Sequence, residues 1–220
     1  MSRFFHVYQY AGPAIALPVS YYCWWAAYGG DHAMTLATLA VPIIYGYVIP
    51  GLGTNWLRLW EFNTRLRIGR FRPHHGFVFG SATSLIALLC MMPARGPFEW
   101  AGLLRSMFVV GTALAFWNWL YDVHALRAGF IVIRREPYQA HLSNEALAME
   151  YAPVFFGSLG ACYGAYLYVA QYLLWSEGRS DLYGWVLLAG VAAVLVIPVC
   201  AYVAASYLRY GASGLSFPKE

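Results

Sequence analysis

Residues 182–208, LYGWVLLAGVAAVLVIPVCAYVAASYL, form one continuous apolar stretch without Asp, Glu, Lys or Arg. A helix of this length crosses a hydrocarbon core of about 30 Å, which needs roughly 20 apolar residues. The whole chain has the same character, since 60% of its residues are hydrophobic and only 11% are charged. This composition cannot cover a soluble globule with polar surface, and it therefore indicates an integral membrane protein.

Five further apolar stretches precede this one. They are Tyr10–Tyr28, Ala33–Pro50, Gly76–Met92, Ala101–Tyr121 and Tyr151–Trp175. Tryptophan residues lie near many of these ends, where their rings favour the headgroup level of a bilayer. The sequence therefore predicts an all-α fold, a polytopic membrane helix bundle of about six transmembrane helices. We expect residues 1–220 to form a single transmembrane domain.

Arginine residues are concentrated in alternate gaps between the predicted spans. The gap after the second span holds Arg58, Arg65, Arg67, Arg70 and Arg72, and the gap after the fourth holds Arg127, Arg134 and Arg135. Positively charged loops stay on the cytoplasmic side of a membrane. We therefore expect both termini in the cytoplasm. The chain has a single Lys among 14 basic residues, which is compatible with a bacterium of high genomic GC content. We therefore expect a bacterial inner membrane as the location.

Small residues repeat along two predicted spans. Gly76, Gly80 and Ser84 recur every four residues in the third span, and Gly157, Gly160 and Gly164 occupy one face of the fifth. Small residues at such spacing let two helix backbones approach closely in a membrane. We expect these two spans to form the packing centre of the bundle.

Polar side chains gather, by the predicted topology, at the cytoplasmic face where the third span begins, the fourth ends and the fifth begins. Imidazole and carboxylate groups together supply proton donors and acceptors or metal ligands. The candidate catalytic residues are Asn118, Asp122, His124, Glu145 and Glu150, and the candidate metal ligands are His74, His75 and His141.

Spacing distinguishes some of these candidates from others. Asn118 and Asp122 are four residues apart and share a helix face, whereas Asp122 and His124 diverge unless the helix ends between them. A carboxylate at the edge of the hydrocarbon is costly unless it is paired or faces a wet cavity. Asp122 is therefore the strongest candidate, with an ion pair to Arg127 or a helix cap as its structural alternative. His74 and His75 are adjacent, so we expect only one to face inward.

Two connecting segments are predicted to form short helices. Residues 54–70 place aromatic and leucine side chains on one side and Arg58, Glu61 and Arg65 on another, which is typical of an amphipathic interfacial helix. Residues 137–150 fit a short helix that Pro137 begins. Lipid headgroups are the expected ligands of Arg65, Arg67, Arg70, Arg72, Arg134 and Arg135.

Two functional hypotheses from different classes follow. The first is a membrane enzyme that acts on a lipid or isoprenoid through the His and carboxylate cluster at the cytoplasmic interface, with a divalent metal as an optional cofactor. The second is a non-catalytic subunit or assembly factor of a membrane redox or pigment complex, suggested by the 18% aromatic content. Expected partners are membrane lipids and a lipid-soluble small molecule, with no nucleic acid. A homo-oligomer or a larger membrane complex is the expected assembly.

Overall fold

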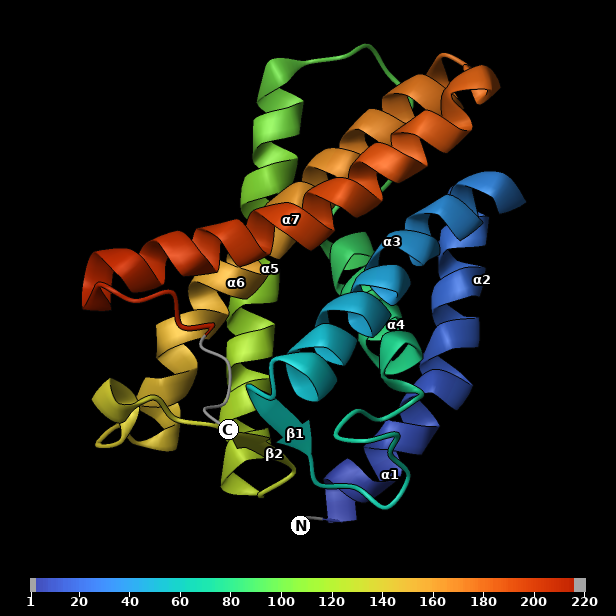
Figure 1. Ribbon diagram of the computed structural model, residues 1–220. Helices are drawn as coiled ribbons and strands as arrows, with labels where there is room; N and C mark the ends of the chain where they lie inside the picture. Colours follow the sequence, from blue (N-terminus) through green and yellow to red (C-terminus); the bar gives the residue numbers. More distant parts are fainter. Residues whose placement is uncertain (1–2, 216–220) are drawn as a thin grey trace.

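The computed structural model describes residues 3–215 and is mostly helical (Figure 1). Its α-helices are α1 (Arg3–Ala11), α2 (Leu17–Ala27), α3 (His32–Gly51), α4 (His75–Cys90), α5 (Trp100–Arg127), α6 (Asn144–Ala170) and α7 (Tyr183–Tyr210). A π-helical turn joins α1 to α2, and others extend α3 and α6. Two short strands, β1 (Trp60–Phe62) and β2 (Ile131–Ile133), pair antiparallel with Glu61 opposite Val132. We call the end of the bundle that carries this sheet the sheet end.

Each of the six apolar stretches is helical. Within the described residues, four helices are long and apolar enough to cross a membrane, namely His32–Trp56, Trp100–Arg127, Asn144–Ser176 and Ser180–Tyr210. The helix α4 has 16 residues and is shorter than a usual crossing. The stretch from α1 through α2 is helical but does not belong to these four. These four candidate spans suggest a helical membrane protein, and the count of six crossings stays a prediction.

Glycine residues determine how closely the helices pack. The helices α5 and α6 form the most extensive pair, and Gly160 of α6 faces the backbone of Val110 and Gly111 of α5. In the pair of α3 and α4, a Cβ atom on Gly46 would lie 3.0 Å from the Gly76 Cα atom. Both predicted small-residue faces therefore lie at close helix contacts.

A tyrosine hydroxyl compensates for a proline inside α3. Pro42 has no N–H, so the carbonyl of Thr38 one turn earlier loses its usual helical donor. The hydroxyl of Tyr163, from α6, donates to this carbonyl at 2.9 Å. An unpaired carbonyl in an apolar interior is costly, and this contact therefore ties α3 to α6.

We expect Tyr163→Phe to lower the free energy of unfolding by about 1 kcal/mol, because it removes one interhelical hydrogen bond and leaves the Thr38 carbonyl unpaired. Unfolding by denaturing detergent in mixed micelles would measure the change. Tyr207→Phe is the matched control, because the Tyr207 side chain is 55% exposed. Equal stability of the two variants would contradict the structural role of Tyr163.

The end of α5 turns the chain into β2. Gly129 adopts φ +64°, which favours glycine, and the Phe130 amide donates to the Ala125 carbonyl while the Gly129 amide donates to that of Leu126. This Schellman motif ends α5 after Arg127. It also buries Phe130, which packs on Phe5 and Phe62 in an apolar core at the sheet end.

The predicted amphipathic helix over residues 54–70 is wrong. After a π-helical turn at Leu52–Trp56, the chain forms β1 and a loop, and the side chains of residues 65–70 are exposed. Trp60 and Phe62 alternate with Glu61, a spacing of two that suits a strand once β2 supplies the partner.

The predicted short helix over residues 137–150 is also wrong as a separate element. A single 3₁₀ turn covers Pro137–Gln139, and α6 already begins at Asn144 and runs without interruption through Tyr151. The side chain of Ser143 accepts the Ala146 amide at 3.2 Å and so caps the start of α6.

Candidate functional site

An apolar cavity of about 280 Å³ lies at the sheet end of the bundle. Its walls come from α3, α4, α5, α6 and α7, from both strands, and from Gly214 and Leu215 after α7. His75 at the start of α4, Asp122 near the end of α5 and Tyr151 near the start of α6 all line it. The predicted meeting of these three helix ends therefore occurs, and Asn118 lines the same cavity.

Asp122 is the buried carboxyl group of this cavity. Its Oδ2 atom accepts a hydrogen bond from the Tyr151 hydroxyl at 2.7 Å, and its residue is 7% exposed. None of the ion pairs of residues 3–215 includes Asp122, and Arg127 pairs with Glu145 instead. The alternative of an ion pair with Arg127 therefore does not hold. Two further polar groups of the cavity lining, the hydroxyls of Tyr45 and Tyr121, are buried without a hydrogen-bond partner in the described region.

His75 faces the cavity and His74 does not. The Nδ1 atom of His75 accepts hydrogen bonds from Nε and Nη2 of Arg72 at 3.1 and 2.8 Å. His74 instead stacks on Tyr10, with ring centroids 5.1 Å apart. Burial, and then the Arg72 charge, lower the pKa of His74. The adjacent histidines therefore have different surroundings, as expected for neighbours in sequence.

The three predicted metal ligands do not come together. His141 is exposed in the loop before α6 and does not line the cavity, whereas His75 does. Among residues 3–215, no group of three His, Cys, Asp or Glu side chains is placed to hold a metal ion. The structure thus offers no support for the metal set His74, His75 and His141.

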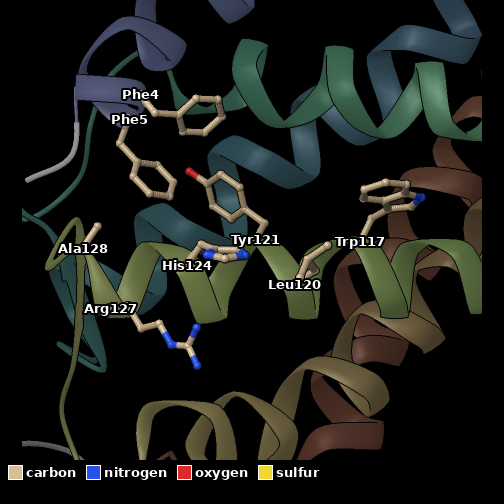
Figure 2. Close-up of a pocket in the computed structure, with 8 residues that line it drawn as sticks. All are labelled: Phe4, Phe5, Trp117, Leu120, Tyr121, His124, Arg127 and Ala128. Atoms are coloured by element: carbon tan, nitrogen blue, oxygen red, sulfur yellow. The ribbon is translucent and has the colours of Figure 1, made fainter.

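His124 lies on the opposite face of α5 from the cavity. It lines an open groove between α1 and α5 together with Phe4, Phe5 and Trp117 (Figure 2). Figure 2 shows Arg127 turned away from Phe4 and Phe5, and its guanidinium pairs with Glu145 at 2.5 Å. Because α5 stays helical to Arg127, Asp122 and His124 diverge. Neither His124 nor Glu145 lines the cavity.

Glu150 lies outside the cavity lining as well. Its carboxylate pairs with Arg209 at 3.2 Å and accepts a bond from the Tyr210 hydroxyl, which ties the end of α7 to α6. Asn118, by contrast, lines the cavity while its amide donates to the Leu114 carbonyl at 2.9 Å. Of the five predicted catalytic residues, Asn118 and Asp122 are the two in the cavity.

The arginines predicted to bind headgroups separate into different environments. Arg65, Arg67 and Arg70 are exposed, as a surface role requires. Arg72 is 1% exposed between aromatic rings, so its prediction as a headgroup ligand is wrong. Arg134 lines the cavity and pairs with Glu136 at 3.3 Å. Arg135 donates to the Leu142 carbonyl and the Asn144 side chain, which fastens the loop before α6.

Four tyrosines of the site were not predicted from the sequence. Tyr45, Tyr121, Tyr151 and Tyr202 all line the cavity. The chain contains 18 tyrosines, so residue type alone carries no signal. Position does carry one for Tyr151, because it lies at the start of a span that the topology places beside Asp122.

No protein-family model matches this chain, and no significant similarity to a curated protein or a solved structure was found. An apolar cavity with a few polar groups is suited to bind a largely apolar molecule and to orient one polar end of it. A buried carboxyl group bonded to a tyrosine hydroxyl can also accept or deliver a proton.

Proposed function

We propose that this protein is a membrane enzyme that acts on a lipid or isoprenoid substrate by acid and base chemistry. In this proposal, Asp122 exchanges a proton with the substrate, and Tyr151 orients the carboxyl group and shares its proton. The observation that carries the proposal is the buried Asp122 carboxyl group, which has a tyrosine partner and no ion pair in the described region, in a cavity with mostly apolar walls. Ionisable groups in such positions are usually retained for function.

The position of Tyr121 supports a lipid-soluble substrate. Tyr121 lines both the cavity and the open groove between α1 and α5, and Figure 2 shows its side chain in the groove. The groove has exposed apolar side chains, including Phe4 and Trp117. We propose that a molecule dissolved in the bilayer enters the cavity from this groove, past Tyr121.

We also propose that the sheet end faces the cytoplasm of a bacterial cell. The exposed arginines at 65, 67 and 70 follow β1 at this end, and basic loops favour the cytoplasmic side. The substrate would then react at the cytoplasmic interface of the plasma membrane. Attachment of a membrane-impermeant reagent to single cysteines introduced at residues 66 and 178 would test the orientation.

The function is tested by comparing lipid extracts from cells with and without this protein, followed by incubation of the purified protein with any compound that accumulates. We expect one lipid-soluble compound to accumulate in cells that lack the protein and the purified protein to convert it. Unchanged lipid extracts, together with purification in a fixed ratio with other membrane proteins, would contradict the enzyme. That result would favour the non-catalytic subunit of a membrane complex.

A further inference from the structure

Arg72 is a buried cation without an acidic partner among the described residues. Its guanidinium carbon lies 4.8 Å from the centre of the Phe62 ring and 5.2 Å from that of Phe130. None of the ion pairs within residues 3–215 includes it, and its Nη1 atom has no hydrogen-bond partner there. Burial of an unpaired charge is costly. The cation–π contacts offset part of this cost. The two hydrogen bonds that Arg72 donates to His75 indicate a role in positioning that imidazole.

The hydrogen bonds of Arg72 determine which nitrogen of His75 carries the proton. A guanidinium group has only donors, and two of its N–H groups meet the His75 Nδ1 atom. This atom must therefore be an acceptor without a proton. The neutral ring then carries its proton on Nε2, and protonation of Nδ1 would break both bonds.

In the described part of the chain, the side-chain hydrogen bonds of His75 all involve Nδ1, so its Nε2–H group is left to bind a ligand in the cavity that the residue lines. Phe62 and Phe79 flank the imidazole, with ring centroids 4.8 and 5.9 Å away. The hydroxyls of Tyr45 and Tyr121, also without a partner there, line the same cavity. The cavity therefore offers one fixed N–H donor and two hydroxyls within largely apolar walls.

We propose that the cavity binds a lipid-soluble carbonyl compound whose oxygen accepts a hydrogen bond from the His75 Nε2–H group, with Arg72 as the positioning residue that fixes this tautomer. A carbonyl oxygen only accepts hydrogen bonds, which suits a donor that cannot accept one. The inference rests on the proposed function for the apolar nature of the ligand. It adds the chemical class, a ketone, aldehyde or quinone in place of a simple hydrocarbon.

The test is a binding measurement that needs no turnover. The probes are geranylacetone, an isoprenoid ketone, and the hydrocarbon of the same chain in which a CH₂ group replaces the C=O group. Binding to the protein in lipid nanodiscs is followed by tryptophan fluorescence, since Trp60 lines the cavity, with empty nanodiscs as the blank. The titrations are repeated with Asp122→Asn, in which catalysis is lost, so that binding is measured without turnover.

We expect the ketone to bind about tenfold more tightly than the hydrocarbon, the preference given by one good hydrogen bond. In His75→Phe the preference should disappear while hydrocarbon binding is retained, which shows that the cavity is still formed. In Arg72→Met the preference should also fall. ¹⁵N spectra of histidine-labelled protein should then show the His75 signals change from a single Nε2–H tautomer to a mixture.

Equal binding of the two probes to the unmodified protein would overturn the inference, and so would a ketone preference that survives in His75→Phe. An unchanged His75 tautomer in Arg72→Met would overturn the role of Arg72. If the ketone preference fails while Asp122-dependent turnover exists, the proposed function stands and the substrate class is wrong. If the preference is found without turnover, the cavity is a carbonyl-binding site in a protein that is not an enzyme.

Discussion

Replacement of Asp122 by Asn is expected to reduce turnover of the lipid-soluble substrate by about two orders of magnitude or more. The amide has nearly the same shape as the carboxyl group and can still accept the Tyr151 hydroxyl, so the cavity should keep its form. The amide cannot exchange a proton near neutral pH, however, and acid and base catalysis through this side chain is lost. Initial rates with the purified variant, on the compound identified from cell extracts, would measure the loss.

Glu145→Gln is the matched control for this prediction, because it makes the same chemical change on the surface. The Glu145 carboxylate pairs with the exposed Arg127 and does not line the cavity. Its turnover should stay within about twofold of the unmodified protein, since exposed ion pairs contribute little. Tyr151→Phe should give a loss between the two, because it leaves Asp122 in place without its donor. Rates within a few-fold of each other for Asp122→Asn and Glu145→Gln would rule out Asp122 as the proton-exchanging group.

Apolar patterning predicted the helices well because each run is long and is bounded by proline, glycine or charged residues. The predicted stretches Ala33–Pro50 and Gly76–Met92 differ from α3 and α4 by only one or two residues at each end. The sheet was not predicted, because each strand has only three residues and its partner strand lies far away in the sequence. Such a short alternation of apolar and polar residues fits a helix as well as a strand until the partner is known.

The candidate site was predicted where helix geometry alone decides the outcome. Asn118 and Asp122 share a face at a spacing of four, and both line the cavity. Arg72 looked like its exposed neighbours Arg67 and Arg70, because its burial depends on Phe130, which arrives from the end of α5. A basic segment in the sequence therefore carried no signal that one of its members supports the cavity from inside the fold.

Gly160→Ala is expected to lower the free energy of unfolding by about 1–3 kcal/mol, because the contact between α5 and α6 has no room for a methyl group. A Cβ atom at this position would lie 2.6 Å from the Val110 carbonyl oxygen and 2.8 Å from the Gly111 Cα atom. Both atoms belong to the backbone of α5 and cannot rotate away as a side chain would. The helices must therefore separate, which also disturbs the spacing of Asp122 and Tyr151 further along the same pair.

Gly157→Ala is the control on the same face of α6. A Cβ atom there would lie 3.6 Å from the Ala115 Cβ atom, an ordinary contact, and alanine favours the helix by up to about 1 kcal/mol relative to glycine. This variant should therefore be as stable as the unmodified protein or slightly more stable. Unfolding of both variants by denaturing detergent would measure the difference. Two glycines one helical turn apart would then respond with opposite signs, which a general preference for small residues does not explain. Equal losses at both positions would instead mean that the spacing of α5 and α6 is not set by backbone contact at Gly160.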